Sequence, residues 1–300
     1  MSSWFRDEDE LGFFQRQACK VLKAGAVPNH VAFIMDGNRR FARKHGYHSV
    51  LKGHELGFDR LSKTLRWCQE FGISEVTVYA FSIENFKRQS CEVDGLMQLA
   101  RAKFTELINE KEKIRENGVC FRFFGNLSKL PTDIQKLIAE ISLFSENFDK
   151  AYFNVCLAYT AQDEMTRAVQ LVVKGVEEGY LEPEDISEHL IDQCLDTRNS
   201  LDPDLLIRTS GELRMSDFLL WQSSYSCLYF DSVLWPEFSF WNMCWAVIHY
   251  QRNLAAIQKM KLAKAQSRRL SWAPNIRQFL QWAESERTKA RQALLQLEEE

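Results

Sequence analysis

Short apolar segments alternate along the chain with longer segments in which apolar residues recur every three or four positions. The short segments predict β-strands, and the longer ones predict amphipathic α-helices. Because this alternation runs from residue 30 to about residue 250 without an internal repeat or a Gly/Ser linker, it predicts one α/β domain with a mostly parallel sheet flanked by helices. The predicted strands are His30–Met35, Glu75–Phe81, Val119–Phe124, Tyr152–Ala158, Asp204–Arg208 and Cys227–Phe230.

The clearest helical pattern lies between the second and third predicted strands. It continues to the dipeptide Asn117-Gly118, which is a typical helix end. Two further helices are predicted to begin near Thr132 and near Gln162. The helix between the second and third predicted strands has a stripe that consists of Leu96, Ala100, Phe104, Leu107, Lys111 and Ile114.

The N-terminal segment, residues 1–27, contains a predicted amphipathic helix within residues 4–25. Two interpretations of this helix are open. In the first, it packs on the core. In the second, it lies in a membrane interface with its Trp and Phe side chains among the lipids. Its stripe consists of Trp4, Leu11, Phe14, Ala18, Val21 and Leu22, with Phe5 and Phe13 beside it.

The C-terminal segment is rich in Lys, Arg, Gln and Glu from Gln258 onward, and Ala273-Pro274 interrupts it once. This composition predicts a solvated helical tail, to which we assign no chemistry. The sequence therefore divides into an N-terminal helix (residues 1–27), a central α/β domain (28–257) and a helical tail (258–300).

Composition and charge limit the kinds of partner. The 300 residues contain 38 Lys and Arg against 41 Asp and Glu, so the formal net charge of −3 provides no bulk cationic field for nucleic acid or an anionic membrane. Eight scattered cysteines without metal-ligand spacing indicate reduced core thiols. The acidic start does not resemble a signal peptide, and no apolar run approaches the ~20 residues that cross a bilayer. We expect a soluble or peripheral protein that faces the cytosol.

Polar residues collect directly after three of the predicted strands. They occupy residues 36–40, 82–88 and 208–216, after the first, second and fifth strands. The carboxyl ends of parallel strands meet at one edge of a sheet, where open α/β sheets bind their ligands. The three segments would therefore bring together one strand-end carboxylate, Asp36, and the guanidinium groups of Arg39, Arg40, Arg88, Arg208 and Arg214.

This combination of groups suits a diphosphate. Guanidinium groups bind phosphate oxygens through two hydrogen bonds, and an isolated Asp beside them suits Mg²⁺ that also binds phosphate. Gly37 allows a phosphate to approach the backbone, and a helix that begins near Asn38 would offer free N–H groups. One Arg or one Asp-Gly pair usually indicates only a surface ion pair or a turn, but such pairs have no reason to collect at equivalent strand ends.

Several common catalytic motifs do not occur in the sequence. The Gly-x-x-x-x-Gly-Lys-Ser/Thr loop and the Gly-x-Gly-x-x-Gly fingerprint are both missing, which disfavours ATPases and nicotinamide enzymes. A Gly-x-Ser-x-Gly elbow is missing as well, so a serine hydrolase of that type is disfavoured.

Five motifs in a fixed order carry a family resemblance. They are residues 30–40 (HVAFIMDGNRR), 53–57 (GHELG), 79–88 (YAFSIENFKR), 204–214 (DLLIRTSGELR) and 234–237 (LWPE). These motifs resemble those of the cis-prenyltransferases, the undecaprenyl diphosphate synthase-like family, and most of all those of its eukaryotic dehydrodolichyl diphosphate synthase branch. The resemblance covers roughly residues 25–250 and implies the single-domain cis-prenyltransferase fold, with residues 28–257 as the catalytic domain.

The resemblance also implies a reaction. Farnesyl diphosphate would be elongated by successive cis condensations with isopentenyl diphosphate, with Mg²⁺ as cofactor, to long-chain dehydrodolichyl diphosphate, a precursor of dolichol for protein glycosylation. Loss of diphosphate leaves an allylic cation, so the enzyme must neutralise the leaving group and exclude water. An apolar tunnel would exclude the water, and ordinary core packing is the alternative role for its candidate residues. These are Leu96, Ala100, Phe104, Leu107 and Ile108.

Site residues follow from the same resemblance. Asp36, Asn85 and Arg88 are implied as catalytic residues, with Asp36 as the Mg²⁺ ligand and with Asn85 and Arg88 at the junction of the two substrates. His54 is a further implied substrate contact, although such a His often caps a helix or fills a core. The implied diphosphate contacts are Gly37, Arg39 and Arg40 on the allylic side, and Arg208, Arg214 and Ser216 on the isopentenyl side, with Arg88 binding substrate at the junction.

Two departures from bacterial homodimeric members set expectations about partners. Those members usually carry His and Glu, placed to help with the metal, where this chain has Leu213 and Cys227. The chain also lacks their C-terminal Arg-x-Gly motif, which completes the neighbouring active site. By resemblance, a Nogo-B-receptor-like subunit supplies this motif, so we expect a heteromer that is weak or inactive without its partner. Its expected location is the cytosolic face of the endoplasmic reticulum membrane, where it would be a peripheral protein.

A non-catalytic scaffold subunit that binds isoprenoid diphosphate or lipid is the alternative function. A protein of that kind would be expected to lose Asp36 or the pair Arg208 and Arg214, and this chain retains all three. The all-α trans-prenyltransferases use Asp-Asp-x-x-Asp helices, and no Asp-Asp pair occurs in the sequence.

Overall fold

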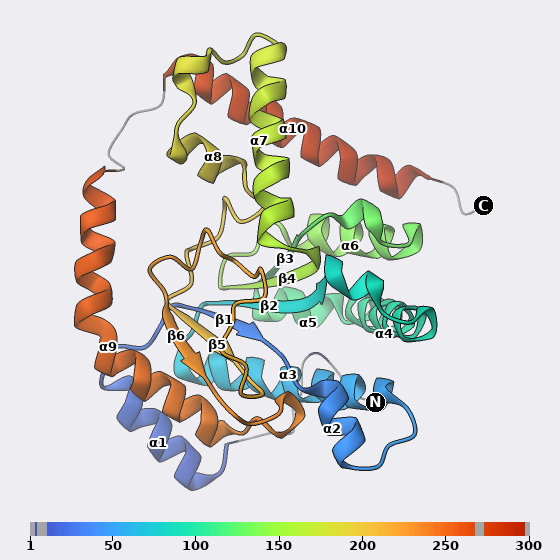
Figure 1. The fold of residues 1–300 in the computed structure, drawn as a ribbon, viewed down its shortest axis with the longest axis vertical. Coiled ribbons are helices and arrows are strands. Elements are labelled where there is room, and N and C mark those ends of the chain that lie inside the picture. The colour runs from blue at the N-terminus through green and yellow to red at the C-terminus, as the bar shows by residue number, and fades with distance from the viewer. Residues whose placement is uncertain (1–3, 5–10, 268–272, 298–300) are drawn as a thin grey trace.

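The computed structural model describes residue 4, residues 11–267 and residues 273–297. Within these residues, six parallel strands form one sheet with the order β3-β4-β2-β1-β5-β6, flanked by helices (Figure 1). This arrangement confirms the predicted α/β fold class, and each strand boundary lies within one residue of its prediction. The strands are β1 (His30–Ile34), β2 (Glu75–Ser82), β3 (Val119–Phe124), β4 (Ala151–Tyr159), β5 (Leu205–Arg208) and β6 (Cys227–Phe230).

The helices follow the predicted order with one difference. The helix predicted to run without a break to Asn117 is interrupted at Glu110, whose backbone leaves the helical region (φ −100°, ψ 24°). The helices predicted near Thr132 and Gln162 are confirmed. The helices are α1 (Phe13–Lys23), α2 (Asn38–Lys44), α3 (Val50–Phe71), α4 (Ser90–Asn109), α5 (Lys111–Asn117), α6 (Thr132–Ser145), α7 (Ala161–Glu177), α8 (Glu188–Cys194), α9 (Phe240–Ser267) and α10 (Pro274–Gln296).

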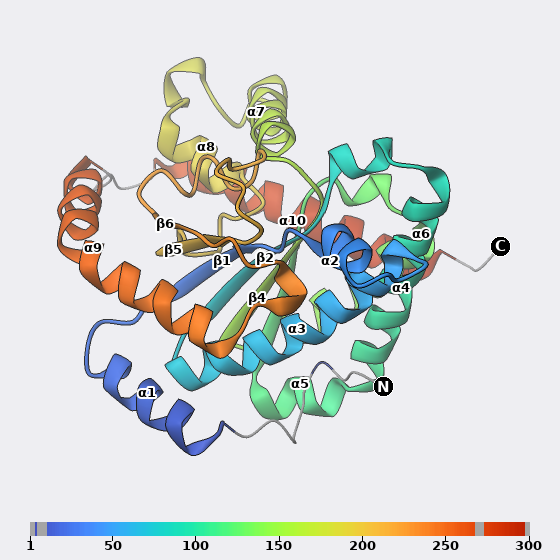
Figure 2. The same cartoon turned by 60° about the horizontal axis from the view of Figure 1, so that its bottom comes forward.

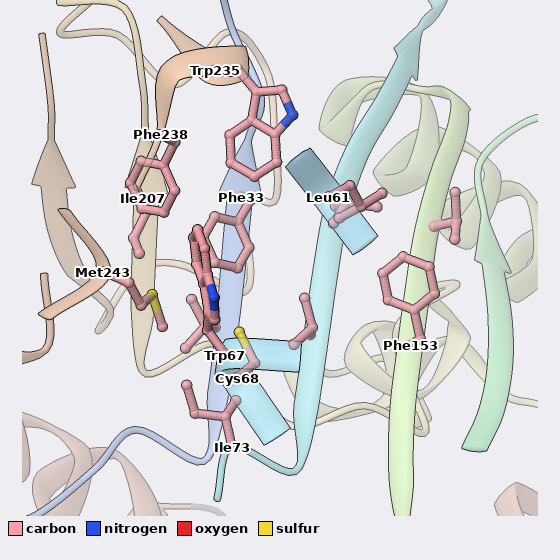
Figure 3. Close-up of a cluster of buried hydrophobic side chains, with 14 of the residues drawn as sticks. Phe33, Leu61, Trp67, Cys68, Ile73, Phe153, Ile207, Trp235, Phe238 and Met243 are labelled. Carbon is pink, nitrogen blue, oxygen red and sulfur yellow. The ribbon is translucent and has the colours of Figure 1, made fainter. Parts of the chain in front are cut away.

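The main hydrophobic core lies on the face of the sheet that α3 and α9 cross (Figure 2). Alternate side chains of β1 point to opposite faces, so Phe33 enters this core while Ile34 packs on the other face against Phe218. Figure 3 shows Trp235 and Phe238 against Phe33, where their ring centroids lie 5.8 Å and 6.3 Å from that of Phe33. The sheet is therefore buried on both faces, as is usual for parallel sheets.

The strand order creates a crevice between β1 and β5. The chain leaves β1 toward β2 on one side, and it leaves β5 toward β6 on the other. Ligands of open α/β sheets bind at such a switch in direction, outside the carboxyl ends of the strands. Ile34 and Arg208 are paired in the register of β1 and β5, so the residues that follow both strands begin at the same edge.

The N-terminal helix is shorter than predicted, and its stripe is divided. Leu11, Ala18 and Leu22 pack on the core, whereas Phe14 and Val21 are more than 70% exposed, so the predicted single buried stripe is wrong. Trp4 does not lie on α1, and Phe5 lies outside the described residues. Among the described helices, none is both long and apolar enough to cross a membrane.

The C-terminal helix α10 packs on the protein, so the predicted solvated tail is wrong. Phe279 is fully buried in a second core that α10 forms with α7 and α8, which Figure 1 shows grouped at one end of the molecule. Gly175 of α7 makes this contact possible, because a Cβ atom there would lie 2.4 Å from the Phe279 ring. The division of the chain at residue 258 stays a prediction.

The cysteines are unpaired, as expected of core thiols. All eight belong to the described residues, and none forms a disulfide. Cys91 differs from the expectation because it is exposed, at the start of α4.

Candidate active site

A cavity of about 890 Å³ opens at the carboxyl ends of β1, β2 and β5. It has a polar end and an apolar end. All of the predicted site residues lie along it, so the structure brings together residues that are up to 180 positions apart in the sequence. The polar end is lined by Asp36, Gly37, Arg39, Arg40, His54, Asn85, Arg88, Arg208, Arg214 and Ser216.

Arg208 and Asp36 form the central ion pair of the polar end. Arg208 is only 2% exposed, and its Nη2 atom donates a hydrogen bond to Oδ2 of Asp36 at 2.9 Å. Its Nη1 atom donates to Oγ of Ser216 at 2.7 Å and to the carbonyl oxygen of Arg214. Its Nε atom is buried without a hydrogen-bond partner among the described residues. An unpaired buried donor costs free energy, so an anionic ligand at this position would be favoured.

Asp36 is ionised in this setting. Burial alone would raise the pKa of its carboxyl, but the hydrogen bond from Arg208, the charges of Arg208 and Arg40 and the N–H of Gly37 together lower it below its ordinary value. The backbone of Asp36 is held as well, because its carbonyl oxygen accepts hydrogen bonds from Thr209 Oγ1 at 2.8 Å and from the Trp235 N–H at 3.0 Å.

Glu212 balances two further arginines. Its carboxylate lies 3.4 Å from Nη2 of Arg40 and also pairs with Arg214. Arg40 in turn lies 3.5 Å from Asp36 and donates from Nη1 to the carbonyl oxygen of Ser210 at 3.1 Å. The guanidinium groups of this half of the site are therefore held by carboxylates and carbonyl oxygens of the chain itself.

Glu92 balances the second group of arginines. Its Oε1 atom lies 2.8 Å from Nη1 of Arg88 and 3.9 Å from Nε of Arg39. Burial, together with the nearby charge of Arg39, lowers the pKa of the Arg88 guanidinium. His54 lies beside this group, and burial together with the positive charge of Arg88 lowers its pKa to about 4, so its imidazole is neutral at physiological pH.

Asn85 reaches the cavity from a short 3₁₀ helix, η1 (Ile83–Lys87), that follows β2. Its Oδ1 atom accepts a hydrogen bond from the N–H of Ser82 at 3.1 Å, which fixes the start of η1. The Asn85 side chain is thereby oriented from the end of the strand at the cavity wall.

The turn after β1 depends on glycine. Gly37 has a φ of +108°, in the region that favours glycine, and it precedes α2 directly. A Cβ atom on Gly53 of α3 would lie 2.1 Å from the carbonyl oxygen of Asn38, and a Cβ atom on Gly57 would lie 2.3 Å from Oδ1 of Asn38. The GHELG segment therefore lets α3 approach the turn that carries Asp36.

The apolar end of the cavity is partly the one predicted. Leu96, Ala100 and Phe104 of α4 line it, but Leu107 does not, because it is fully buried in the core. Trp4 also lines this end, although the sequence pattern placed it on the N-terminal helix. The remaining apolar lining includes Phe58, Leu61, Val78, Phe81, Met97, Leu99, Phe153, Val155 and Leu157.

Contacts of the N–H group and of the aromatic ring hold the Trp4 indole in place. Its Nε1 atom donates a hydrogen bond to the carbonyl oxygen of Lys103 at 2.7 Å. Its ring contacts Phe58, Phe121 and Phe153 edge to face, at centroid distances of 4.7 to 6.1 Å. The first described residue of the chain therefore closes part of the apolar end.

The residues that could hold a divalent cation are few. No group of three or more His, Cys, Asp or Glu side chains with a metal-binding arrangement occurs in residue 4, residues 11–267 or residues 273–297. Mg²⁺, however, keeps several waters and commonly binds one or two carboxylates together with substrate phosphates. The ionised Asp36, at the edge of the cavity, fits that smaller requirement.

The two positions that depart from bacterial members lie away from Asp36. The side chain of Leu213 is exposed and does not line the cavity. Cys227 begins β6 and is paired with Leu205, at the amino end of β5, whereas the site lies at the carboxyl end. Within this chain, Cys227 therefore lies at the opposite edge of the sheet from Asp36.

Sequence reasoning missed the acids that balance the arginines. Glu92 lies in a helix and not in a strand-end segment. Its pairing with Arg88 is a local contact four residues apart, whereas only the fold brings it to Arg39. Glu212 lies within the third predicted segment, between Arg208 and Arg214 in the sequence. This position was the available signal that it pairs with arginines. Tyr79 and Trp4 are further cavity residues: we assigned Tyr79 no role from the sequence, and we placed Trp4 on the N-terminal helix.

Comparison with protein families gives a match over most of the chain. Residues 34–257 match a family described as putative undecaprenyl diphosphate synthase. The chain is 53% identical over 267 residues to the dehydrodolichyl diphosphate synthase complex subunits of mouse and human, which covers 89% of this chain and 80% of each relative. It is 45% identical over 245 residues to a tritrans,polycis-undecaprenyl-diphosphate synthase (geranylgeranyl-diphosphate specific) of Methanocaldococcus jannaschii, covering 81% and 87% of the two chains.

Comparison with solved structures agrees with the family match. The fold is similar to lavandulyl diphosphate synthase from Lavandula x intermedia in complex with dimethylallyl diphosphate, with a TM-score of 0.70 and 32% identity over 75% of this chain and 95% of that one. It is also similar to a probable undecaprenyl diphosphate synthase from Campylobacter jejuni, with a TM-score of 0.61 and 30% identity over 75% and 96% of the two chains.

Proposed function

Since the chain belongs to the undecaprenyl diphosphate synthase-like family of prenyltransferases, we propose that it is the catalytic subunit of a heteromeric cis-prenyltransferase. It elongates farnesyl diphosphate by successive cis condensations with isopentenyl diphosphate and yields long-chain dehydrodolichyl diphosphate. The observation that carries this proposal is the continuity of one cavity from an arginine-rich end to an apolar end.

The two ends of the cavity suit the two parts of a polyprenyl diphosphate. Guanidinium groups favour a diphosphate and stabilise the charge that develops on it as the allylic C–O bond breaks. The apolar end, whose lining includes Phe104 and Phe153, favours binding of the isoprenoid chain and keeps water away from the allylic cation. A site of this composition serves ionisation and chain growth together.

The polar residues divide between the two substrates in this proposal. The allylic diphosphate binds Gly37, Arg39 and Arg40, and the isopentenyl diphosphate binds Arg208, Arg214 and Ser216. The second set is supported by the bond from Arg208 to Ser216 and by the unpaired Nε of Arg208. Asn85, Arg88 and His54 line the same cavity, and in this proposal they serve the junction of the two substrates.

Mg²⁺ is the proposed cofactor, with Asp36 as its protein ligand. When bound, the cation would neutralise phosphate charge and make diphosphate a better leaving group. Asp36 is suited to this role because its carboxyl is ionised and lies between Arg40 and Arg208, the arginines assigned to the two substrates.

The partner and the location are further parts of the proposal. The printed names of the mouse and human relatives describe them as subunits of a complex. A Nogo-B-receptor-like subunit supplies the Arg-x-Gly motif that this chain lacks, and the complex works as a peripheral protein on the cytosolic face of the endoplasmic reticulum membrane. There its product serves dolichol synthesis for protein glycosylation. The exposed Phe13, Phe14 and Val21 of α1 are consistent with contact to a membrane surface.

An activity assay tests the reaction and the partner together. The purified full chain is incubated with farnesyl diphosphate, labelled isopentenyl diphosphate and Mg²⁺, with and without a Nogo-B-receptor-type subunit. We expect long polyprenyl diphosphates with the partner and little product without it. Geranylgeranyl diphosphate in place of farnesyl diphosphate measures the preference for the allylic substrate.

Other outcomes would contradict parts of this proposal. Failure of both arms to give a long prenyl product would refute the proposed reaction. Product that forms equally well without the partner would refute the heteromer but not the reaction. The scaffold alternative would gain support if Asp36→Ala left cellular dolichol unchanged.

A further inference from the structure

The turn that carries Ser216 has an unusual backbone. Ser216, Asp217 and Leu219 all have positive φ angles, of +51°, +57° and +47°. Non-glycine residues in this region are strained and persist only where the surroundings hold them. The turn connects Arg214 to Phe218 beside the cavity, so the contacts that hold it also determine where Ser216 lies.

The hydroxyl of Tyr79 is one of these contacts. It lies 3.1 Å from the carbonyl oxygen of Tyr159, at the end of β4, and 3.4 Å from that of Ser216. Its ring stacks on Phe218 at a centroid distance of 4.6 Å and an interplanar angle of 13°. Phe218 is fully buried, so Tyr79 holds the turn through a polar contact on one side and an aromatic contact on the other.

The start of α7 is the second contact. The N–H of Ala161 donates to the carbonyl oxygen of Asp217 at 2.8 Å, and the N–H of Gln162 donates to Oδ1 of Asp217 at 3.2 Å. These N–H groups belong to the first turn of the helix, where backbone donors have no partner within the helix and a carboxylate is favoured. Asp217 therefore links the turn to the start of α7, which directly follows β4.

The segment that carries Ser216 also positions the buried side chain of Arg208. Arg208 donates from the same Nη1 atom to Ser216 Oγ and to the Arg214 carbonyl oxygen, which are both parts of this segment. If the turn relaxed to an ordinary backbone conformation, both acceptors would move away from Nη1. Arg208 would then lose both contacts of Nη1 and would be held only through the hydrogen bond from Nη2 to Asp36.

We infer that Tyr79 and Asp217 are positioning residues for the isopentenyl diphosphate site. They hold the Ser216 turn in its left-handed conformation, and the turn orients Arg208 toward the diphosphate. This inference rests on the proposed function, and it concerns only the isopentenyl side of the cavity. The allylic contacts of Gly37 and Arg40 do not depend on the turn in the same way, because α2 and the Ser210 carbonyl hold them.

Two variants test the side chains with matched controls. Tyr79→Phe removes the hydroxyl but keeps the ring on Phe218, and Tyr180→Phe, at a residue that lies after α7 and stacks on Trp282, is its control. Asp217→Ala removes the acceptor for the Gln162 N–H, and Asp217→Asn, which keeps an Oδ1 atom, is its control. Melting temperatures of all four variants report whether the chain still folds.

The measurements separate the two substrates. With the partner present, we expect Tyr79→Phe and Asp217→Ala to raise KM for isopentenyl diphosphate about two- to tenfold, the range of one lost hydrogen bond. KM for farnesyl diphosphate and kcat at saturation should change less than about twofold, and the two controls should follow the wild type. A merely structural role would change both KM values or neither, and either result would overturn the inference.

A binding measurement separates this inference from the proposed function. Isopentenyl diphosphate titrated alone into the full chain cannot react, so calorimetry gives its Kd directly. We expect Kd to rise by the same factor as KM in Tyr79→Phe, while Tyr180→Phe keeps the wild-type value. A wild-type chain that binds isopentenyl diphosphate but makes no product even with the partner subunit present counts against the proposed reaction. A wild-type chain that turns over, with unchanged KM and Kd in Tyr79→Phe, counts against the inference alone.

Discussion

Asp36 and Arg208 are joined by a hydrogen bond of 2.9 Å across the neighbouring carboxyl ends of β1 and β5. In the proposed division of the site, Asp36 serves the allylic diphosphate and Arg208 the isopentenyl diphosphate. The two substrate positions are therefore linked through one ion pair, which is only 3% exposed on the arginine side. Changes at either residue should affect the reaction in different and measurable ways.

Removal of the negative charge of Asp36 should strongly reduce turnover. Asp36→Asn keeps the shape of the side chain but leaves Arg208 and Arg40 without their shared counter-charge and offers a poorer ligand to Mg²⁺. We expect kcat to fall by about 10²-fold or more, the usual effect of removing one preorganised electrostatic group. Steady-state kinetics with the partner measure this loss. The exposed Asp149→Asn is the control, and a loss shared by both variants would contradict the assignment.

Arg208→Ala should act on one substrate far more than on the other. It removes the donor to Ser216 and leaves the isopentenyl side without its buried guanidinium, so we expect KM for isopentenyl diphosphate to rise at least about tenfold. KM for farnesyl diphosphate should change little. Equal effects on both KM values would show that the assignment of the two sides is wrong. Arg66→Ala, on the outer part of α3, controls for the loss of one positive charge.

His54 should make stability depend on pH. Its pKa is about 4 in the folded chain against about 6.5 in an unfolded one, so folding favours the neutral imidazole. The stability contributed by this preference is present above pH 6.5 and is lost as the pH falls toward 4. By pH 5 the loss should be about 2 kcal/mol, since each unit of pKa difference corresponds to about 1.4 kcal/mol.

Urea unfolding at pH 7.5 and pH 5.0 measures this effect. The free energy of unfolding of the wild type should fall more between the two pH values than that of His54→Gln. His48→Gln, at an exposed position, should keep the wild-type dependence. An identical fall in His54→Gln and the wild type would rule out His54 as the source.

Phe279→Ala should destabilise the chain through the C-terminal helix. The ring is fully buried between α7, α8 and α10, so its removal should leave a cavity and lower the free energy of unfolding by about 3–5 kcal/mol. Phe14→Ala, at a position 77% exposed, should change stability by less than about 0.5 kcal/mol. Equal stability of the two variants would mean that α10 does not pack on α7 and α8 in solution.

Trp4→Ala should change the length of the polyprenyl product. The indole occupies part of the apolar end, so its loss gives the growing chain more room, and we expect a shift toward longer products. Separation of the labelled products by chain length measures this shift. Trp245→Ala, on the exposed side of α9, should leave the distribution unchanged. An unchanged distribution for Trp4→Ala would show that its ring does not limit chain growth.

Much of the fold follows from local patterns in the sequence. The bounds of Val119–Phe124 and Cys227–Phe230 were predicted without error, because both strands are short, mostly apolar runs with clear ends. The break at Glu110 was not predicted, since Leu107 and Ile114 keep the same helical stripe on both sides of it. The packing of α10 was missed for another reason: three apolar side chains are enough to dock a helix of mostly polar composition.

The site shows the same limit of local reasoning. The strand-end rule located the predicted arginines, because chain direction alone brings parallel strand ends to one edge. Trp4 could not be assigned in that way, because its partners Phe58, Phe121 and Phe153 come from three separate elements far along the chain. The pairing of Glu92 with Arg39 likewise depends on how α4 lies against α2, whereas Arg88 is a local partner four residues before Glu92.

The acids that neutralise the arginines have a consequence for selectivity. A diphosphate that enters the polar end must compete with Glu212 for Arg40 and Arg214, so binding is an exchange of one anion for another. A singly charged carboxylate or a monophosphate gains little in such an exchange, whereas a diphosphate carries enough charge to displace the glutamate. The chain would thus select ligands by their charge density. A ligand binds Arg40 and Arg214 only if its negative charge is high enough to displace the carboxylate of Glu212.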